Sequence, residues 1–112
     1  MIHPTTLSLA AFQENADRAS RLLKALSNER RLMILCQIGE GEQRVGDLQS
    51  VVGLSQSALS QHLALLREEG LVSTRKDGTS VLYRIADPAA LKIIAVLVEI
   101  YCPPPAEGAE IK

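Results

Sequence analysis

The chain of 112 residues is predicted to fold as one mainly α-helical domain that carries a single β-hairpin, an α+β arrangement. Apolar residues recur at helical spacing over most of the sequence. Between residues 71 and 85 they alternate instead, in segments rich in Val, Thr, Leu, Ile and Tyr on either side of an Asp-Gly pair. Hydrophobic residues make up 46% of the chain, a fraction typical of a globular domain, and the length leaves no room for a second core.

Four helices are expected before the hairpin, because apolar residues recur there at helical spacing and start or stop signals bound three of the segments. Polar caps begin the second and fourth segments, and glycines follow the second, third and fourth. In chain order, the expected helices are residues 9–26; the segment after the Ser27-Asn28-Glu29 cap, up to Gly39; residues 45–52, ended by Gly53; and the segment between the Ser55 cap and Gly70.

The hairpin is expected to have strands at residues 71–75 and 80–85, with residues 76–79 between them. Asp87 and Pro88 then open a final helix, since proline is tolerated at the first helical position. The sequence therefore predicts the order helix, helix, helix, helix, hairpin, helix. The third and fourth helices, joined by a glycine-containing turn, form a helix-turn-helix, and the hairpin forms a wing beside it.

The final helix, AALKIIAVLVEIY, is apolar nearly all round and is interrupted only by Lys92 and Glu99. A helix of this kind must be covered on more than one side. The core of the domain covers one side, and a second copy of the chain is the simplest cover for the other. We expect residues 9–102 to form the folded domain between two flexible ends, residues 1–8 and 103–112.

The fourth helix has a polar, uncharged face at its N-terminal end, opposite a stripe of leucines that faces inward. Glutamine can bond adenine bidentately, serine can bond several base edges or a phosphate, and such a face fits the major groove of DNA. The alternative is an ordinary solvated helix face. The candidate DNA contacts on this helix are Gln56, Ser57, Ser60 and Gln61.

His62 has two interpretations: it contacts the DNA backbone or groove, or it packs beneath the helix and caps a neighbour. Arg75, Lys76 and Arg84 lie on the hairpin and are the natural contacts to phosphate or to the minor groove, unless they serve only solubility. Residues 44–84 contain five basic and four acidic residues, and the whole chain has a net charge of -1. Non-specific DNA affinity should therefore be modest, and specific binding must depend on base contacts, DNA shape and two subunits acting together.

The segments ALSNERRLMIL, VGDL and LSQSALSQHLALLREEGLVSTRKDGTSVLYRI resemble the ArsR/SmtB family of winged-helix repressors over roughly residues 18–102. The resemblance implies a homodimer built on the first and last helices, which represses a nearby operon. Two recognition helices about 34 Å apart would then bind a near-palindromic operator.

The sequence departs from the metal-sensing members of that family. Residues 44–48 contain no cysteine, the last helix has no histidine, and Glu99 stands alone there, whereas zinc requires three or four ligands. No metal and no other cofactor is expected, and a metal-responsive repressor is the less favoured alternative.

Cys36 and Cys102 are the only cysteines. By itself, Cys36 within LMILCQI is interpreted as a small core side chain, whereas Cys102 at a helix end is more available to solvent. However, R-L-x-I-L-C and Tyr101-Cys102-Pro103 resemble the SqrR/BigR/YgaV/HlyU-type dithiol branch of the family. That resemblance implies that reactive sulfur species or oxidants join the two thiols, as a polysulfide or a disulfide, and thereby weaken DNA binding.

Three other classes of function are alternatives. A HlyU-type antirepressor or activator would bind DNA without control by sulfur, and a protein-binding winged helix would never meet DNA. An enzyme is disfavoured, because the sequence has no Cys-x-x-Cys, no phosphate-binding loop and no acid-base cluster. With no run of about 18 apolar residues and no secretory signal, the protein is expected in the cytoplasm, without a membrane partner.

Overall fold

The structure is a computed structural model that describes residues 8–102. The predictions for residues 1–7 and 103–112 lie outside this range, and Ser8 caps the first helix by accepting a hydrogen bond from the Ala11 N–H. In chain order the elements are α1 (Leu9–Leu26), α2 (Glu29–Ile38), β1 (Gln43–Arg44), α3 (Val45–Val52), α4 (Gln56–Glu68), β2 (Val72–Asp77), β3 (Ser80–Ile85) and α5 (Pro88–Tyr101).

Helices α2, α4 and α5 begin at the predicted caps, which satisfy backbone N–H groups that have no partner within a helix. The Asn28 side chain accepts from the N–H of Arg31 at 3.0 Å, and the Ser55 hydroxyl accepts from the N–H of Ala58 at 3.2 Å. At the start of α5 the Asp87 carboxylate accepts from the N–H of Ala89. The predicted fold class, a winged helix-turn-helix of five helices and a hairpin, is confirmed.

The sheet is larger than predicted. The sequence indicated a two-stranded hairpin, but β1 adds a third antiparallel strand in the order β1-β3-β2. Gln43 pairs with Tyr83 and Arg44 pairs with Leu82. A strand of two residues has no measurable periodicity of its own, and it is recognised only by a partner far along the chain.

The turn of the hairpin is also shorter than predicted. Residues 76–79 were expected between the strands, but Lys76 pairs with Val81 and Asp77 pairs with Ser80, so only Gly78 and Thr79 form the loop. Gly78 has a φ of 67°. A two-residue loop with glycine at a positive φ in its first position matches the twist of the strands and allows the ladder to continue to the turn.

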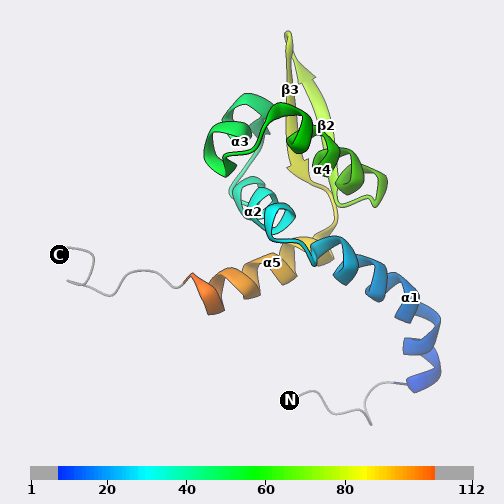
Figure 1. Ribbon diagram of the computed structural model, residues 1–112. Coiled ribbons are helices and arrows are strands. Elements are labelled where there is room, and N and C mark those ends of the chain that lie inside the picture. Colours follow the sequence, from blue (N-terminus) through cyan, green and yellow to red (C-terminus); the bar gives the residue numbers. More distant parts are fainter. Residues whose placement is uncertain (1–7, 103–112) are drawn as a thin grey trace, which may run out of the picture.

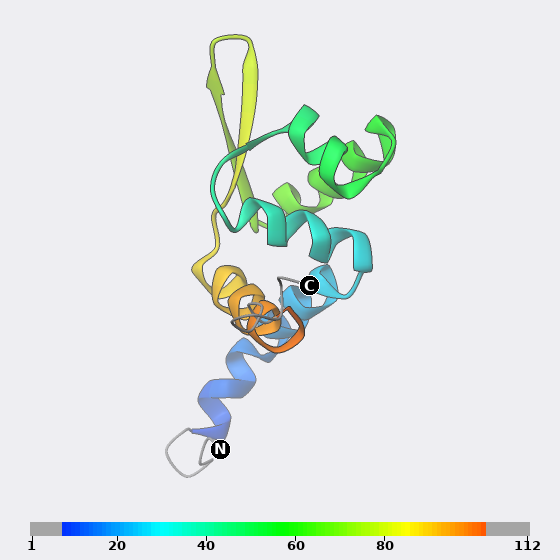
Figure 2. The ribbon, with the colours of Figure 1, turned by 90° about the vertical axis from the view of Figure 1, so that its left-hand side faces the viewer.

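Helix α2 lies at the centre of the molecule and packs against the other four helices (Figure 1). On one side are α3, α4 and the hairpin, and on the other are α1 and α5, so that the hairpin projects away from α1 and α5 (Figure 2). The fully buried large side chains are Ile34, Leu35, Leu48, Leu59, Leu63, Leu66 and Leu71. Burial of each contributes about 1.5–3 kcal/mol relative to exposure.

Helices α1 and α5 keep a large apolar surface exposed. The core of the chain thus covers only one side of α5, through Ala90 and Ile94. Of the helices in the part of the chain that is described, none combines the length and apolar character needed to cross a membrane. The exposed apolar residues of α1 and α5 are Leu9, Phe12, Leu23, Leu91, Val96, Val98, Ile100 and Tyr101.

Candidate nucleic-acid interface and thiol pair

The turn between α3 and α4 sets the direction of the candidate recognition helix. Gly53 ends α3 in the left-handed conformation, with a φ of 70°, and its N–H bonds the carbonyl of Gln49. Ser55 then caps α4. Leu59, Leu63 and Leu66 bury one face of α4, as the sequence predicted, so the opposite face is left to solvent. The four candidate DNA contacts, Gln56, Ser57, Ser60 and Gln61, are all exposed on α4.

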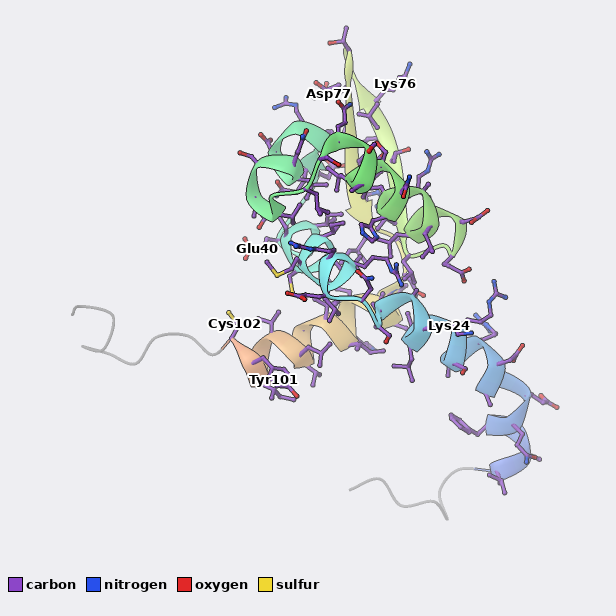
Figure 3. The ribbon with its side chains drawn as sticks, in the orientation of Figure 1. Lys24, Glu40, Lys76, Asp77, Tyr101 and Cys102 are labelled. Carbon is purple, nitrogen blue, oxygen red and sulfur yellow. The ribbon has the colours of Figure 1, made fainter. Side chains whose placement is uncertain are left out.

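The wing displays the three basic residues identified from the sequence. Arg75, Lys76 and Arg84 are all exposed, and Lys76 lies near the tip of the hairpin (Figure 3). Because Arg75 pairs with Leu82 on β3, and side chains alternate along each strand, Arg75 and Arg84 share one face of the sheet. Lys76 belongs to the other face.

An acidic residue that the sequence pattern did not single out contacts one of these side chains. The Glu42 carboxylate accepts two hydrogen bonds from the Arg75 guanidinium, at 2.7 Å from Nε and 2.8 Å from Nη2. These bonds lower the pKa of Glu42 and raise the pKa of Arg75, with Arg84 adding to the effect on Glu42. Glu42 is therefore ionised at neutral pH.

His62 is half-buried on α4, close to the start of α2. Burial lowers the pKa of its imidazole, and the charges of Arg31 and Arg30 lower it further. The ring is consequently neutral at pH 7. The ring lies beside the first turn of α2, which carries Arg30 and Arg31.

The two cysteines, far apart in the sequence, line one groove between α2 and α5. Cys36 is half-buried in α2, whereas Cys102 is exposed at the C-cap of α5, where its N–H bonds the carbonyl of Val98 at 2.7 Å. Figure 3 shows Cys102 at the end of α5. The groove has a volume of about 240 Å³, and its other lining residues are Leu32, Ile94, Leu97, Val98 and Tyr101.

The groove alters the acidity of the Cys36 thiol. Burial raises the pKa of the Cys36 thiol above its ordinary value of 9.0, and Cys102 and Glu40 raise it further. Cys36 is therefore mostly protonated at neutral pH, and since the thiolate is the nucleophile, its reactivity is restrained. Within residues 8–102, no group of three or more His, Cys, Asp and Glu side chains is arranged to hold a metal ion.

Comparison with known proteins identifies relatives of this chain among bacterial regulatory proteins. Residues 28–74 match the family model described as "Bacterial regulatory protein, arsR family". The transcriptional activator HlyU of Vibrio cholerae is 47% identical over 96 residues, which cover 86% of this chain and 89% of HlyU. The structure of reduced HlyU has a TM-score of 0.80, at 48% identity, over 84% of this chain and 99% of that chain.

Two further relatives carry informative descriptions. The biofilm growth-associated repressor of Agrobacterium fabrum is 38% identical over 98 residues, which cover 88% of this chain and 84% of the repressor. A protein of Mycobacterium bovis, described as a homodimeric winged helix-turn-helix DNA-binding domain, has a TM-score of 0.69 at 33% identity, over 79% of this chain and 82% of that chain. The chain therefore belongs to the arsR family of bacterial regulatory proteins, and it is a DNA-binding transcriptional regulator rather than an enzyme.

Proposed function

We propose that this regulator acts in the cytoplasm as a homodimer whose two α4 helices bind an operator, and that joining Cys36 to Cys102 through sulfur weakens this binding. The observation that carries the proposal is that both thiols line the same apolar groove between α2 and α5. Thiols are kept reduced in the cytoplasm, so the unjoined, DNA-binding form is the resting state.

The homodimer would form through α1 and α5. Both helices expose large apolar side chains, including Phe12 at 55% and Ile100 at 60%. A contiguous apolar surface of this kind is typical of a protein interface. The similar domain from Mycobacterium bovis is described as homodimeric. A symmetric pair would present two α4 helices, about 34 Å apart, to a near-palindromic site.

On each subunit, α4 would lie in the major groove. Gln56, Ser57, Ser60 and Gln61 would contact base edges or nearby phosphates from its exposed face. Arg75, Lys76 and Arg84 would contact the backbone or the minor groove from the wing. His62 would support the position of α4 from its inner side.

The sulfur chemistry can be written with an organic persulfide, RSSH, as both sulfur donor and oxidant. A Cys102 thiolate attacks the outer sulfur of one RSSH and releases RS⁻, which leaves Cys102–S–SH. This persulfide takes the outer sulfur of a second RSSH in the same way and becomes Cys102–S–S–SH. The Cys36 thiolate then attacks the middle sulfur and expels HS⁻. In total, two thiols and two RSSH give one trisulfide, two RSH and one H₂S.

A chain of sulfur atoms suits two helices better than a direct bond. A disulfide needs Cα atoms within about 7 Å, so a direct bond would strain α2 and α5 if these helices hold the two Cα atoms farther apart. Each inserted sulfur lengthens the link by about 2 Å and relieves that strain. The site should therefore favour persulfides, which give trisulfide or tetrasulfide, over oxidants that give only a disulfide.

The link would reach DNA through α2 and α5. Helix α2 packs against α4, and α5 belongs to the proposed dimer surface, so tying them together changes the spacing of the two α4 helices. A coupling of about 1–3 kcal/mol would weaken operator binding roughly 5- to 150-fold.

The test compares wild type with Cys36→Ser and Cys102→Ser, before and after persulfide treatment. Fluorescence anisotropy with DNA upstream of the regulated operon measures affinity, and intact mass identifies the link. We expect both variants to bind DNA normally and to lose the response. Wild type should gain about 30 Da as a trisulfide, whereas a disulfide alone loses about 2 Da. A variant that still responds, or a wild type that only loses mass with excess persulfide, contradicts the proposal.

A second candidate is an activator that works by displacing another protein from DNA. It is favoured by the name of the HlyU relative, a transcriptional activator, whereas the Agrobacterium relative is named a repressor. Mapping the binding site separates the two. A site that overlaps the promoter and blocks transcription in vitro supports repression, and an upstream site where binding raises transcription only beside a silencing protein supports the alternative.

A further inference from the structure

One face of the wing holds three arginines and the carboxylates of Glu42 and Asp77, and of these two acids Glu42 is the one that hydrogen-bonds an arginine, Arg75. The register pairs both Arg44 and Arg75 with Leu82, so these residues lie in one row across the three strands. Arg84 lies on the same face, two residues further along β3. Glu42 precedes β1 and reaches across this face to Arg75. We call Arg44, Arg75, Arg84 and Glu42 the arginine face.

The contact between Glu42 and Arg75 has the geometry with which arginine binds a phosphate. Both carboxylate oxygens accept from the fork of the guanidinium, at 2.7 and 2.8 Å. This two-pronged arrangement is shared by carboxylates and phosphates, and it occupies the donors that point in one direction. While Glu42 holds the fork, those two donors of Arg75 cannot serve a DNA backbone.

We propose that Glu42 is an internal competitor for DNA phosphate, which occupies the fork of Arg75 in the free protein and must release it before the wing can bind DNA. The inference rests on the proposed contact between the wing and DNA. In this role Glu42 lowers the affinity of the protein for DNA of any sequence, since a phosphate contact carries no sequence information.

The position of Glu42 makes it a stronger competitor for Arg75 than the other acidic residues nearby. The fork of Arg75 and the neighbouring charge of Arg84 keep the Glu42 carboxylate ionised. In addition, β1 fixes the backbone next to Glu42 against β3, so the carboxylate is held in place rather than moving with a free loop. In the free protein, Arg75 therefore has the Glu42 carboxylate beside it, whereas a DNA phosphate is available only after the protein has bound DNA.

The experiment is a double-mutant cycle of Glu42→Gln, Arg75→Gln and both together. Affinity for a random duplex is measured by anisotropy at salt concentrations between about 50 and 200 mM. We expect Glu42→Gln to tighten binding about two- to fivefold, the scale of an exposed ion pair. The slope of log affinity against log salt should steepen by up to about 0.9, equivalent to one phosphate contact. In the Arg75→Gln background, the same change at Glu42 should have little effect.

Asp77→Asn is the matched control, because it removes a charge that also acts on Arg75, from the tip of the same hairpin (Figure 3), without breaking the fork. It should tighten binding less than Glu42→Gln. Thermal unfolding of each variant checks that the wing remains folded.

The outcomes separate this inference from the proposed wing contact. If Arg75→Gln weakens binding but Glu42→Gln does not strengthen it, Glu42 only fastens β1 to the wing and the inference is overturned. If Arg75→Gln changes neither the affinity nor the salt slope in either background, Arg75 makes no contact with DNA, and the inference fails while a wing contact through Lys76 or Arg84 still stands. If Asp77→Asn tightens binding as much as Glu42→Gln does, Glu42 acts only through the general repulsion between its charge and DNA, and the inference is also overturned.

Discussion

At the scale of single residues, the two thiols of one groove differ in exposure. Cys102 is exposed, whereas Cys36 is half-buried and has a raised pKa, for which burial is the leading cause. An incoming sulfur donor should therefore meet Cys102 first. Cys36 would act second, once the donor sulfur is already beside it and the low fraction of thiolate matters less.

The acidity of Cys36 gives a prediction that does not depend on DNA. In a Cys102→Ser variant, burial still raises the pKa of Cys36, although the contribution of Cys102 is lost. At about pH 7.5 its alkylation by iodoacetamide should be slower than that of a small free thiol. The rate should continue to rise with pH beyond 9.0, the ordinary value. A rate that levels off below about pH 8 would indicate a lowered pKa and contradict this account.

Individual residues differ in how far the sequence could identify them. The polar face of α4 is a local pattern within one helix, so Gln56 and Ser60 were candidates from the sequence alone. The pair of Glu42 and Arg75 spans 33 positions, and only the pairing of three strands brings the two together. The meeting of Cys36 and Cys102 also followed from no local pattern; it was expected only through a family resemblance.

At the scale of elements, the positive φ of Gly53 permits the turn that directs α4. At a φ of 70° a β-carbon is unfavourable even though no atom lies within 4 Å of its position. Gly53→Ala should therefore lower the free energy of unfolding by about 1 kcal/mol. The matched control is Gly46→Ala inside α3, where space is also free and the backbone is helical, and where alanine should stabilise by about 0.5–1 kcal/mol. Urea denaturation measures both, and equal effects would contradict the role of Gly53.

The elements also show why helix boundaries were predictable and the sheet was not. The helical spacing of apolar residues is a local pattern, and Gly53 marks the end of α3, so the predicted ranges 9–26 and 45–52 match α1 and α3. Strand β1 has two residues and exists because β3 lies beside it. Its formation depends on packing that brings distant parts of the chain together, which no local spacing contains.

At the scale of the whole molecule, the distribution of apolar surface is uneven. The buried core lies around α2, while α1 and α5, which lie opposite the wing (Figures 1 and 2), leave large apolar side chains exposed. The groove that holds Cys36 and Cys102 lies between α2 and α5, next to this surface. A change in the link between the thiols would thus act on both the DNA-binding half and the proposed dimer surface.

The dimer is tested by placing a charge on α5. Val96 is 50% exposed, and Val96→Glu should prevent association, because a carboxylate buried at an apolar interface without a partner is strongly unfavourable. Light scattering should then give the mass of one chain instead of two. Operator affinity should fall by about 100-fold or more, since two half-sites are no longer bound as one unit.

The matched control is Val51→Glu. Val51 is 54% exposed but lies on α3, away from α1 and α5, so this variant should keep the mass of two chains. Circular dichroism must show that both variants retain their helices. If Val96→Glu remains dimeric while folded, α5 is not the interface, and the coupling between the thiol groove and the spacing of the two α4 helices would require another route.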